Sequence, residues 1–304
     1  AFLNHDTGEH HPERPDRMRA IDKALSAGVF DELFSREAPL RDDDITYMAM
    51  AHGPAHLANV GAVVQHIVGE PKQVYPDTVA SSGTWEAARR AVGAGLDAVD
   101  LVMGGKVSNA FCQVRPPGHH AESNRAMGFC FFNNIAIAAL YARAKHGAER
   151  IAVVDFDVHH GNGTQEIFWS DKDLFYASTH QMPLYPGTGA KDETGTKNNI
   201  VNAPLSPNVG SDHFREAFKS RVLTALHDFS PDLILISAGF DAHHRDPLAQ
   251  INLVGEDFDW ATGRLLEVAD RFAKNRVVSL LEGGYDLEGL AESAGLHIAR
   301  LMKG

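Results

Sequence analysis

The chain has 304 residues, of which 44% are hydrophobic and 22% charged, and its formal net charge is −12. This composition is ordinary for a globular protein, and the acidic balance argues against general binding to nucleic acid or anionic membranes while suiting cationic ligands. No run reaches the roughly 18 uninterrupted apolar residues of a membrane span, and no signal peptide is visible. We therefore expect a cytoplasmic protein in which Cys112 and Cys130, both in apolar surroundings, are reduced core thiols.

Short apolar runs alternate with longer segments of helical periodicity along the chain. In chain order the predicted elements are helices 12–28, 54–69 and 83–103, strand 110–114, helix 133–146, strands 151–156 and 174–179, helix 211–229 with Ser211 or Asp212 as N-cap, strand 233–238, helix 256–274 and strand 277–281. The strand runs show little polar alternation, which is typical of strands buried on both faces. With no repeat or linker in sight, we expect one α/β domain over residues 1–304, with a mostly parallel sheet covered by helices on both faces.

Polar motifs follow every predicted strand. In chain order they are "RPPGHHAESNRAMGFCFFNN", "DVHHGNGT", "HQMPLYPGTG", "GFDAHHRDPL" and "EGGYDLEGL". Ligands of parallel α/β sheets bind beyond the carboxyl ends of the strands. The sequence therefore predicts that these motifs meet in one site.

Asp157 and His159 indicate a metal. Residues at i and i+2 of an extended backbone project to the same face, and Asp241 at the end of another strand could supply a third ligand. Two carboxylates and one imidazole suit a catalytic zinc, although iron(II), manganese and cobalt remain open. The alternative is that Asp157 and His159 only cap the strand end, which the further histidines at other strand ends disfavour.

Three further side chains suit proton transfer and oxyanion stabilisation beside such a metal. The loop residues His119 and His120 follow "RPPG" and could transfer protons, and Tyr285 after two glycines could donate to an oxyanion. The alternative for each is structural, namely a pair of loop histidines and a half-buried core tyrosine.

Taken together, the motifs resemble the zinc-dependent histone deacetylase family, in its class II branch with the bacterial histone deacetylase-like amidohydrolases. The resemblance rests on "HHPERPDR", "RPPGHHAE", "GFCFFNN", "DFDVHHGNGT", "YPGTG", "SAGFDAHHRDPL" and "LEGGYDL", which run from His10 to Leu287. "RPPGHH" and Asn162 favour class II. The related arginases bind two metals through additional aspartates, and "DVHHG" lacks one directly after its histidines, which favours one catalytic metal.

The resemblance implies a role for each of these residues. Asp157, His159 and Asp241 would be the zinc ligands, with His160 directed elsewhere. His119 and His120 would be the tandem catalytic histidines, with His120 as main general base and acid. Asp155 would orient His119, Asn162 would orient His120, and Tyr285 would donate to the oxyanion.

The resemblance also implies a substrate channel and two accessory sites. Phe129, next to Gly128, and Tyr185 would be the aromatic walls, although the family usually has phenylalanine at the second position, and Leu248 would stand at the mouth. Arg17 would lie near an internal product-exit cavity. Asp155, Asp157 and Ser178 would contribute to a K⁺ or Na⁺ site.

The implied activity is metal-dependent removal of acetyl or other short acyl groups from lysine side chains. The partner would be an acetylated lysine peptide or protein, or else a small cationic N-acyl amine such as an acetylpolyamine. A third interpretation is that the protein is not an enzyme but a module that binds acyl-lysine. The acyl-chain length, the native metal and the oligomeric state stay open, and a homo-oligomer is compatible with the sequence.

Overall fold

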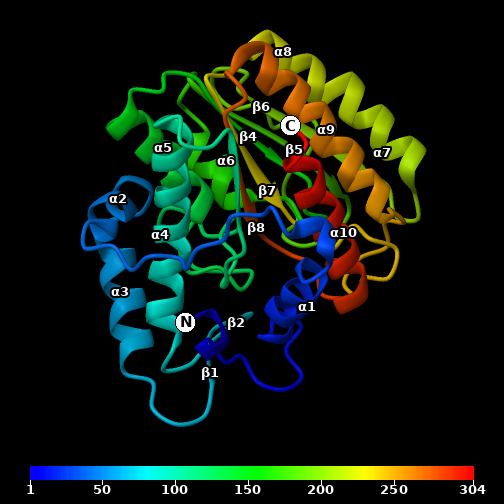
Figure 1. Ribbon diagram of the computed structural model, residues 1–304. Helices are drawn as coiled ribbons and strands as arrows, with labels where there is room; N and C mark the ends of the chain where they lie inside the picture. Colours follow the sequence, from blue (N-terminus) through cyan, green and yellow to red (C-terminus); the bar gives the residue numbers. More distant parts are fainter.

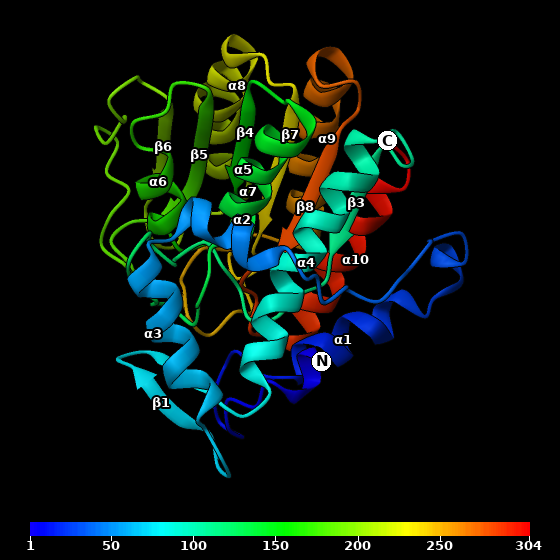
Figure 2. The same ribbon diagram turned by 90° about the vertical axis from the view of Figure 1, so that its left-hand side faces the viewer.

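All five predicted strands form, and a sixth joins them in one parallel sheet. The computed structural model describes residues 1–304 (Figure 1). The strands are β3 (Asn109–Cys112), β4 (Ile151–Asp155), β5 (Leu174–Gln181), β6 (Ile200–Leu205), β7 (Leu233–Ala238) and β8 (Val277–Leu281). Their order is β3-β8-β7-β4-β5-β6, and Figure 2 shows them side by side. Every pair is parallel, as expected from strands without polar alternation.

The sixth strand, β6, escapes the sequence pattern because an asparagine and a proline interrupt its apolar run. It carries Asn202 and Pro204 within six residues, and only one of its sides pairs, with β5. Proline is tolerated in edge strands because its missing N–H can face away from the ladder. The segment therefore lacks the continuous apolar run by which a central strand is recognised.

Helices cover both faces of the sheet, which confirms the predicted layers (Figures 1 and 2). One face carries α2 (Asp44–Ala51), α3 (Pro54–Gln65), α4 (Thr84–Met103) and α5 (Asn134–His146). The other carries α1 (Asp16–Leu25), α7 (Ser211–Ala217), α8 (Thr224–Phe229), α9 (Gly255–Phe272) and α10 (Leu287–Leu301). A π-helical segment, η3 (Phe218–Leu223), joins α7 to α8, and short 3₁₀ turns lie at η1 (Phe2–Asn4) and η2 (Gly28–Phe30).

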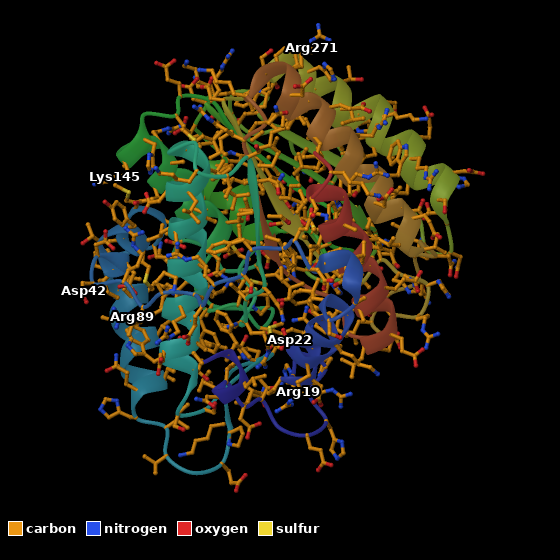
Figure 3. All side chains as sticks on the ribbon, in the orientation of Figure 1. Arg19, Asp22, Asp42, Arg89, Lys145 and Arg271 are labelled. Atoms are coloured by element: carbon orange, nitrogen blue, oxygen red, sulfur yellow. The ribbon has the colours of Figure 1, made fainter.

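The two apolar cores meet at the sheet, because alternate residues of each strand face opposite layers. In β4, Val153 packs into the core under α4 and α5, whereas Val154 packs into the core under α9. Both are fully buried. Charged side chains such as Arg19, Lys145 and Arg271 lie at the periphery instead (Figure 3). None of the helices is both long and apolar enough to cross a bilayer. Cys112 and Cys130 are buried and unpaired, as expected.

Three helices and one cap differ from the prediction. The sequence pattern misses α2, α10 and α6 (Asn162–Phe168), and α6 is only two turns long and mostly buried. The helix at 211 is capped by Gly210, not by Ser211 or Asp212. The Ser211 hydroxyl instead donates to Asp257 Oδ2 at 2.6 Å, so the hydroxyl stabilises the start of α9 and not its own helix.

A small hairpin lies outside the main sheet. Its strands, β1 (Lys72–Tyr75) and β2 (Thr78–Ala80), pair antiparallel and were not predicted. The hairpin connects α3 to α4, and Figure 2 shows β1 well below the six-stranded sheet, on the side toward which β7 and β8 point. This places the hairpin on the side of the sheet to which the polar motifs belong.

Candidate active site

The ends of β4 and β7 bring the three predicted metal ligands together. These strands are neighbours in register, with Asp155 level with Ser237, and the chain leaves β4 toward Asp157 and His159 and leaves β7 toward Asp241. The potential ligand atoms of Asp157, His159 and Asp241 all lie within 4.8 Å of one another. This is the switch region of a parallel sheet, where ligand sites are expected.

The local backbone differs from the extended segment on which the i and i+2 argument rests. β4 ends at Asp155, and the residues from Asp157 to His159 form a bend. His159 N–H donates to Asp157 Oδ1 at 2.9 Å, a local side-chain turn that brings the two residues to the same point. The convergence therefore comes from a polar turn and not from strand geometry.

The donor set fits a cation. His159 Nδ1 lies 3.2 Å from Asp157 Oδ1 and 3.0 Å from Asp241 Oδ2, so one ring nitrogen faces two carboxylates. Burial, followed by the charge of Asp157, raises the pKa of Asp241 to about 7. Burial opposes ionisation of Asp157 too, but His119 and His159 outweigh it and hold its pKa below the usual value. Two buried carboxylates this close need a positive charge, which a divalent metal would supply.

Glycines make room for these carboxylates. A Cβ atom on Gly239 would overlap the Asp157 carboxylate, and one on Gly283 would overlap the carboxylates of both Asp157 and Asp241. Gly283 N–H also donates to Asp157 Oδ2 at 2.8 Å. The backbone thus approaches the ligands more closely than any residue with a side chain allows.

The tandem histidines lie beside this cluster, in the irregular loop after β3. The rings of His119 and His120 are 4.0 Å apart between centroids. His119 Nδ1–H donates to Asp155 Oδ2 at 2.9 Å, the contact expected from the resemblance. Burial alone would lower the pKa of His119, but the carboxylates of Asp155, Asp157 and Glu282 raise it to about 10.

His120 has the opposite electrostatic setting. Burial, followed by the charges of His119 and His159, holds its pKa well below the usual value, so the ring is neutral. Its Nδ1 bonds Asn162 Oδ1 at 2.9 Å, while Asn162 Nδ2 donates to Glu122 Oε1 at 2.7 Å. Because Glu122 can only accept, the Asn162 oxygen must face His120, and the proton of the neutral ring sits on Nδ1. The lone pair of Nε2 is then free to take a proton.

Tyr285 faces the cluster from the end of β8. Burial and the charges of Asp241 and Asp157 raise its pKa well above the usual value, which keeps the hydroxyl protonated and able to donate. Arg17 lies 5.1 Å from the Tyr285 ring centroid, is fully buried, and donates to the carbonyls of Gly284 at 2.7 Å and of Glu282. Glu13 pairs with Arg17 at 3.1 Å. Arg17 thus holds the backbone that presents Tyr285.

Two buried carboxylates that sequence reasoning passed over support the same elements. Glu282 Oε2 accepts from Gly118 N–H at 2.7 Å and His119 N–H at 3.2 Å. Burial raises the pKa of Glu282 to about 7. Its position in the motif "LEGGY" could have indicated a role for Glu282, but the sequence analysis considered only the tyrosine of that motif. Asp246, in "HHRDPL", accepts from the N–H groups of Tyr285 at 2.7 Å and Leu248 at 3.0 Å.

Two of the expected channel residues pack against His120 and Tyr285. The Tyr185 ring meets His120 edge-on at 5.1 Å between centroids, and the Phe129 ring meets Tyr285 at 6.0 Å. Gly128 and Phe129 both have positive φ, 58° and 68°, and any side chain at Gly128 would collide with His120. Tyr185 and Leu248 are 39% and 36% exposed, so both side chains reach the protein surface.

The remaining predicted positions also have defined surroundings. Ser178 lies level with Asp155 on the neighbouring strand, and its Oγ bonds His180 Nδ1 at 2.8 Å. The ring of His160 turns away from the ligand cluster, toward Thr188 at 2.8 Å and Gln165 at 3.0 Å.

Comparison with known proteins points to one family. The model of the histone deacetylase domain matches residues 11–301. The chain is 37% identical to a histone deacetylase-like amidohydrolase of Pseudomonas aeruginosa, over 97% of this chain and 77% of that protein. It is 42% identical to an uncharacterized protein of Synechocystis, over 96% and 94% of the two chains. The crystal structure of the HDA15 HD domain superposes with a TM-score of 0.89 at 38% identity, covering 100% of this chain and 89% of that one.

Proposed function

Because the chain belongs to the histone deacetylase family, we propose that it is a zinc-dependent amidohydrolase that removes acetyl or other short acyl groups from lysine side chains. The observation that carries the proposal is the meeting, just beyond neighbouring strand ends, of a buried carboxylate–imidazole triad, two adjacent histidine rings and Tyr285. Family membership supports hydrolysis of amides, and the residues named here support the finer mechanism.

Asp157, His159 and Asp241 would hold the zinc ion. When bound, zinc would polarise the acyl carbonyl and lower the pKa of a water molecule toward about 7. The chain has no cysteine among these ligands, and two carboxylates with one imidazole leave a coordination position for water or substrate. Ser178, with Asp155 and Asp157, would contribute to a separate K⁺ or Na⁺ site.

The side chains divide the remaining work between them. His120 Nε2 accepts the proton of the attacking water, while Asn162 keeps the Nδ1 proton in place. Tyr285 donates its hydroxyl to the oxygen on which negative charge develops. The protonated His120 then gives its proton to the leaving amine nitrogen, so that a carboxylic acid and a free amine depart. His119, held by Asp155, adds positive charge beside the reacting atoms.

The test is a panel of N-acyl substrates with the zinc-loaded protein. Acetyl-lysine peptides, longer acyl-lysine peptides and acetylpolyamines are compared for kcat/KM, and bound metal is measured by atomic emission. Tyr285→Phe should lower kcat by about 100- to 1000-fold, because an oxyanion donor is lost. Absence of hydrolysis of every N-acyl amine, or an unchanged rate for Tyr285→Phe, would refute the proposal.

A small cationic N-acyl amine is the second candidate substrate. The net charge of −12 favours cationic ligands, and basic peptides and polyamines share that property. The same panel separates the two, since a polyamine-specialised enzyme would prefer acetylpolyamines over acetyl-lysine peptides. Tight acyl-lysine binding with no turnover after zinc loading would instead indicate a binding module.

A further inference from the structure

One hydrogen bond joins the mouth of the channel to a segment far away in the sequence. The Tyr185 hydroxyl donates to Asp77 Oδ2 at 2.7 Å, across 108 positions. Asp77 lies in the turn between β1 and β2, in the hairpin outside the main sheet. Tyr185, at the position where the family usually has phenylalanine, thus uses its additional hydroxyl to bond the Asp77 carboxylate.

The same turn also holds the opposite wall. Phe129 N–H donates to Thr78 Oγ1 at 3.2 Å, and the Thr78 hydroxyl donates to Asp77 Oδ1 at 2.9 Å. Thr78 is fully buried beneath the turn. Asp77 thus uses one oxygen for the Tyr185 ring and the other for the residue that anchors Phe129. A single carboxylate connects both aromatic walls.

The Tyr185 ring has few other constraints. It is 39% exposed and lies in a loop, and its packing within the site is edge-on, against His120 at 5.1 Å and His159 at 6.3 Å between centroids. Exposed aromatic rings on loops move readily unless they are held. The bond to Asp77 fixes the hydroxyl end of the ring.

We propose that the Asp77–Tyr185 hydrogen bond braces the channel mouth and is a specificity determinant, setting the distance between the aromatic walls so that short acyl-lysine arms are preferred over bulkier ones. This inference rests on the proposed function and deepens it. Asp77 acts through Tyr185 and is a positioning residue. Freed from the brace, the ring swings outward, short arms bind less tightly and wider acyl groups enter more easily.

Steady-state kinetics on acetyl-lysine and butyryl-lysine peptides tests the brace. Tyr185→Phe keeps the ring and removes only the hydroxyl, so KM for the acetyl peptide should rise by about three- to tenfold with kcat nearly unchanged, as expected when uniform binding is lost. The acetyl-to-butyryl ratio of kcat/KM should fall. Tyr75→Phe, the same change elsewhere in the hairpin, should leave both quantities at wild-type values.

A double-mutant cycle assigns the effect to the pair. Asp77→Ala should reproduce the Tyr185→Phe phenotype, Asp77→Asn should recover part of it through its amide oxygen, and Asp77→Ala/Tyr185→Phe should add nothing beyond the stronger single change. The brace would be refuted if the changes in kcat/KM of the two single variants multiplied in the double variant. It would also be refuted if Tyr185→Phe left the acetyl-to-butyryl ratio of kcat/KM unchanged.

Urea unfolding of the wild type, Asp77→Ala, Tyr185→Phe and the double variant gives a measurement that does not depend on activity. Non-additive free energies of unfolding would support the bond itself, and additive ones would overturn it. A wild-type protein that hydrolyses no N-acyl amine would refute the proposed function and with it the role in specificity, whereas an active wild type with unaltered variants would refute the brace alone.

Discussion

The buried cluster and the exposed residues around it, the floor and the mouth of the channel that we propose, are built in opposite ways. Asp155, Asp157 and Asp241 on the floor are almost completely buried and lie at or just beyond strand ends, and each of them is hydrogen-bonded. The mouth consists of loops and a hairpin, and Tyr185 and Leu248 are more than a third exposed. Residues fixed by a sheet keep reacting groups in place, whereas loops tolerate change. Substitutions on the floor should therefore alter kcat, and those at the mouth should alter KM and selectivity.

The largest effect is expected from removal of a metal ligand. Asp241→Asn should lower kcat/KM by about 1000-fold or more, because metal-ion catalysis contributes several kcal/mol. Bound zinc should fall well below one equivalent by atomic emission. Asp259→Asn, which breaks only the pair with Arg300 on the far helices, is the matched control and should keep full metal and activity. Full activity of Asp241→Asn would refute the ligand assignment.

Loss of the general base should come next. His120→Ala should lower kcat by about 100- to 10,000-fold, with little change in the KM for acetyl-lysine peptide. Because His120 is neutral and His119 is held by a carboxylate, His119→Ala should cost less. Kinetics of the two variants at saturating zinc decides the order, and a larger loss for His119→Ala would reverse the assignment of the main base.

A smaller effect should reveal the support beneath the histidines. Glu282→Gln replaces the carboxylate that accepts from Gly118 and His119, and kcat should fall by about tenfold, the lower end for groups that orient catalytic residues. KM should change less than twofold. Glu288→Gln removes an exposed glutamate nearby and serves as control. If KM rose by the same factor as kcat fell, Glu282 would contribute to substrate binding and not only to the position of His119.

The last effect is on stability and not on activity, and it concerns the core beneath the floor. His297 is completely buried between Thr262, at 2.6 Å, and Ser279, at 2.8 Å, and burial lowers its pKa to about 3. Since the unfolded pKa is about 6.5, the unfolded chain binds the extra proton below that pH. The free energy of unfolding is therefore unaffected by His297 above pH 6.5. Between pH 6.5 and pH 3 it falls by about 1.4 kcal/mol per pH unit, because protonation of His297 favours the unfolded chain.

Urea unfolding at pH 7 and pH 5 measures this loss. In His297→Gln the free energy of unfolding should fall by about 2 kcal/mol less between these pH values than in the wild type. His227→Gln, at the partly exposed end of α8, should follow the wild type. Identical pH slopes for wild type and His297→Gln would mean that His297 does not titrate as its burial implies.

The same contrast explains what sequence could and could not predict. Continuous apolar runs mark five of the six strands, and polar motifs after them predict that the site residues meet at one end of the sheet. β6 and the hairpin lack such runs. Pro204 interrupts the apolar residues of β6, and the strands of the hairpin are only four and three residues long. Glu282 and Asp246 bind backbone N–H groups, and such partners depend on the folded chain and not on spacing. Sequence therefore named the residues of the motifs and missed the buried carboxylates that hold the backbone around them.

Gly239 and Gly283 carry a consequence for protein engineering. Because a Cβ atom at either position would overlap a carboxylate of the triad, no side chain is compatible with an intact site. A randomised library that includes these positions spends most of its members on inactive proteins. A library confined to Asp77, Tyr185 and Leu248 samples new acyl preferences while the reacting groups keep their arrangement.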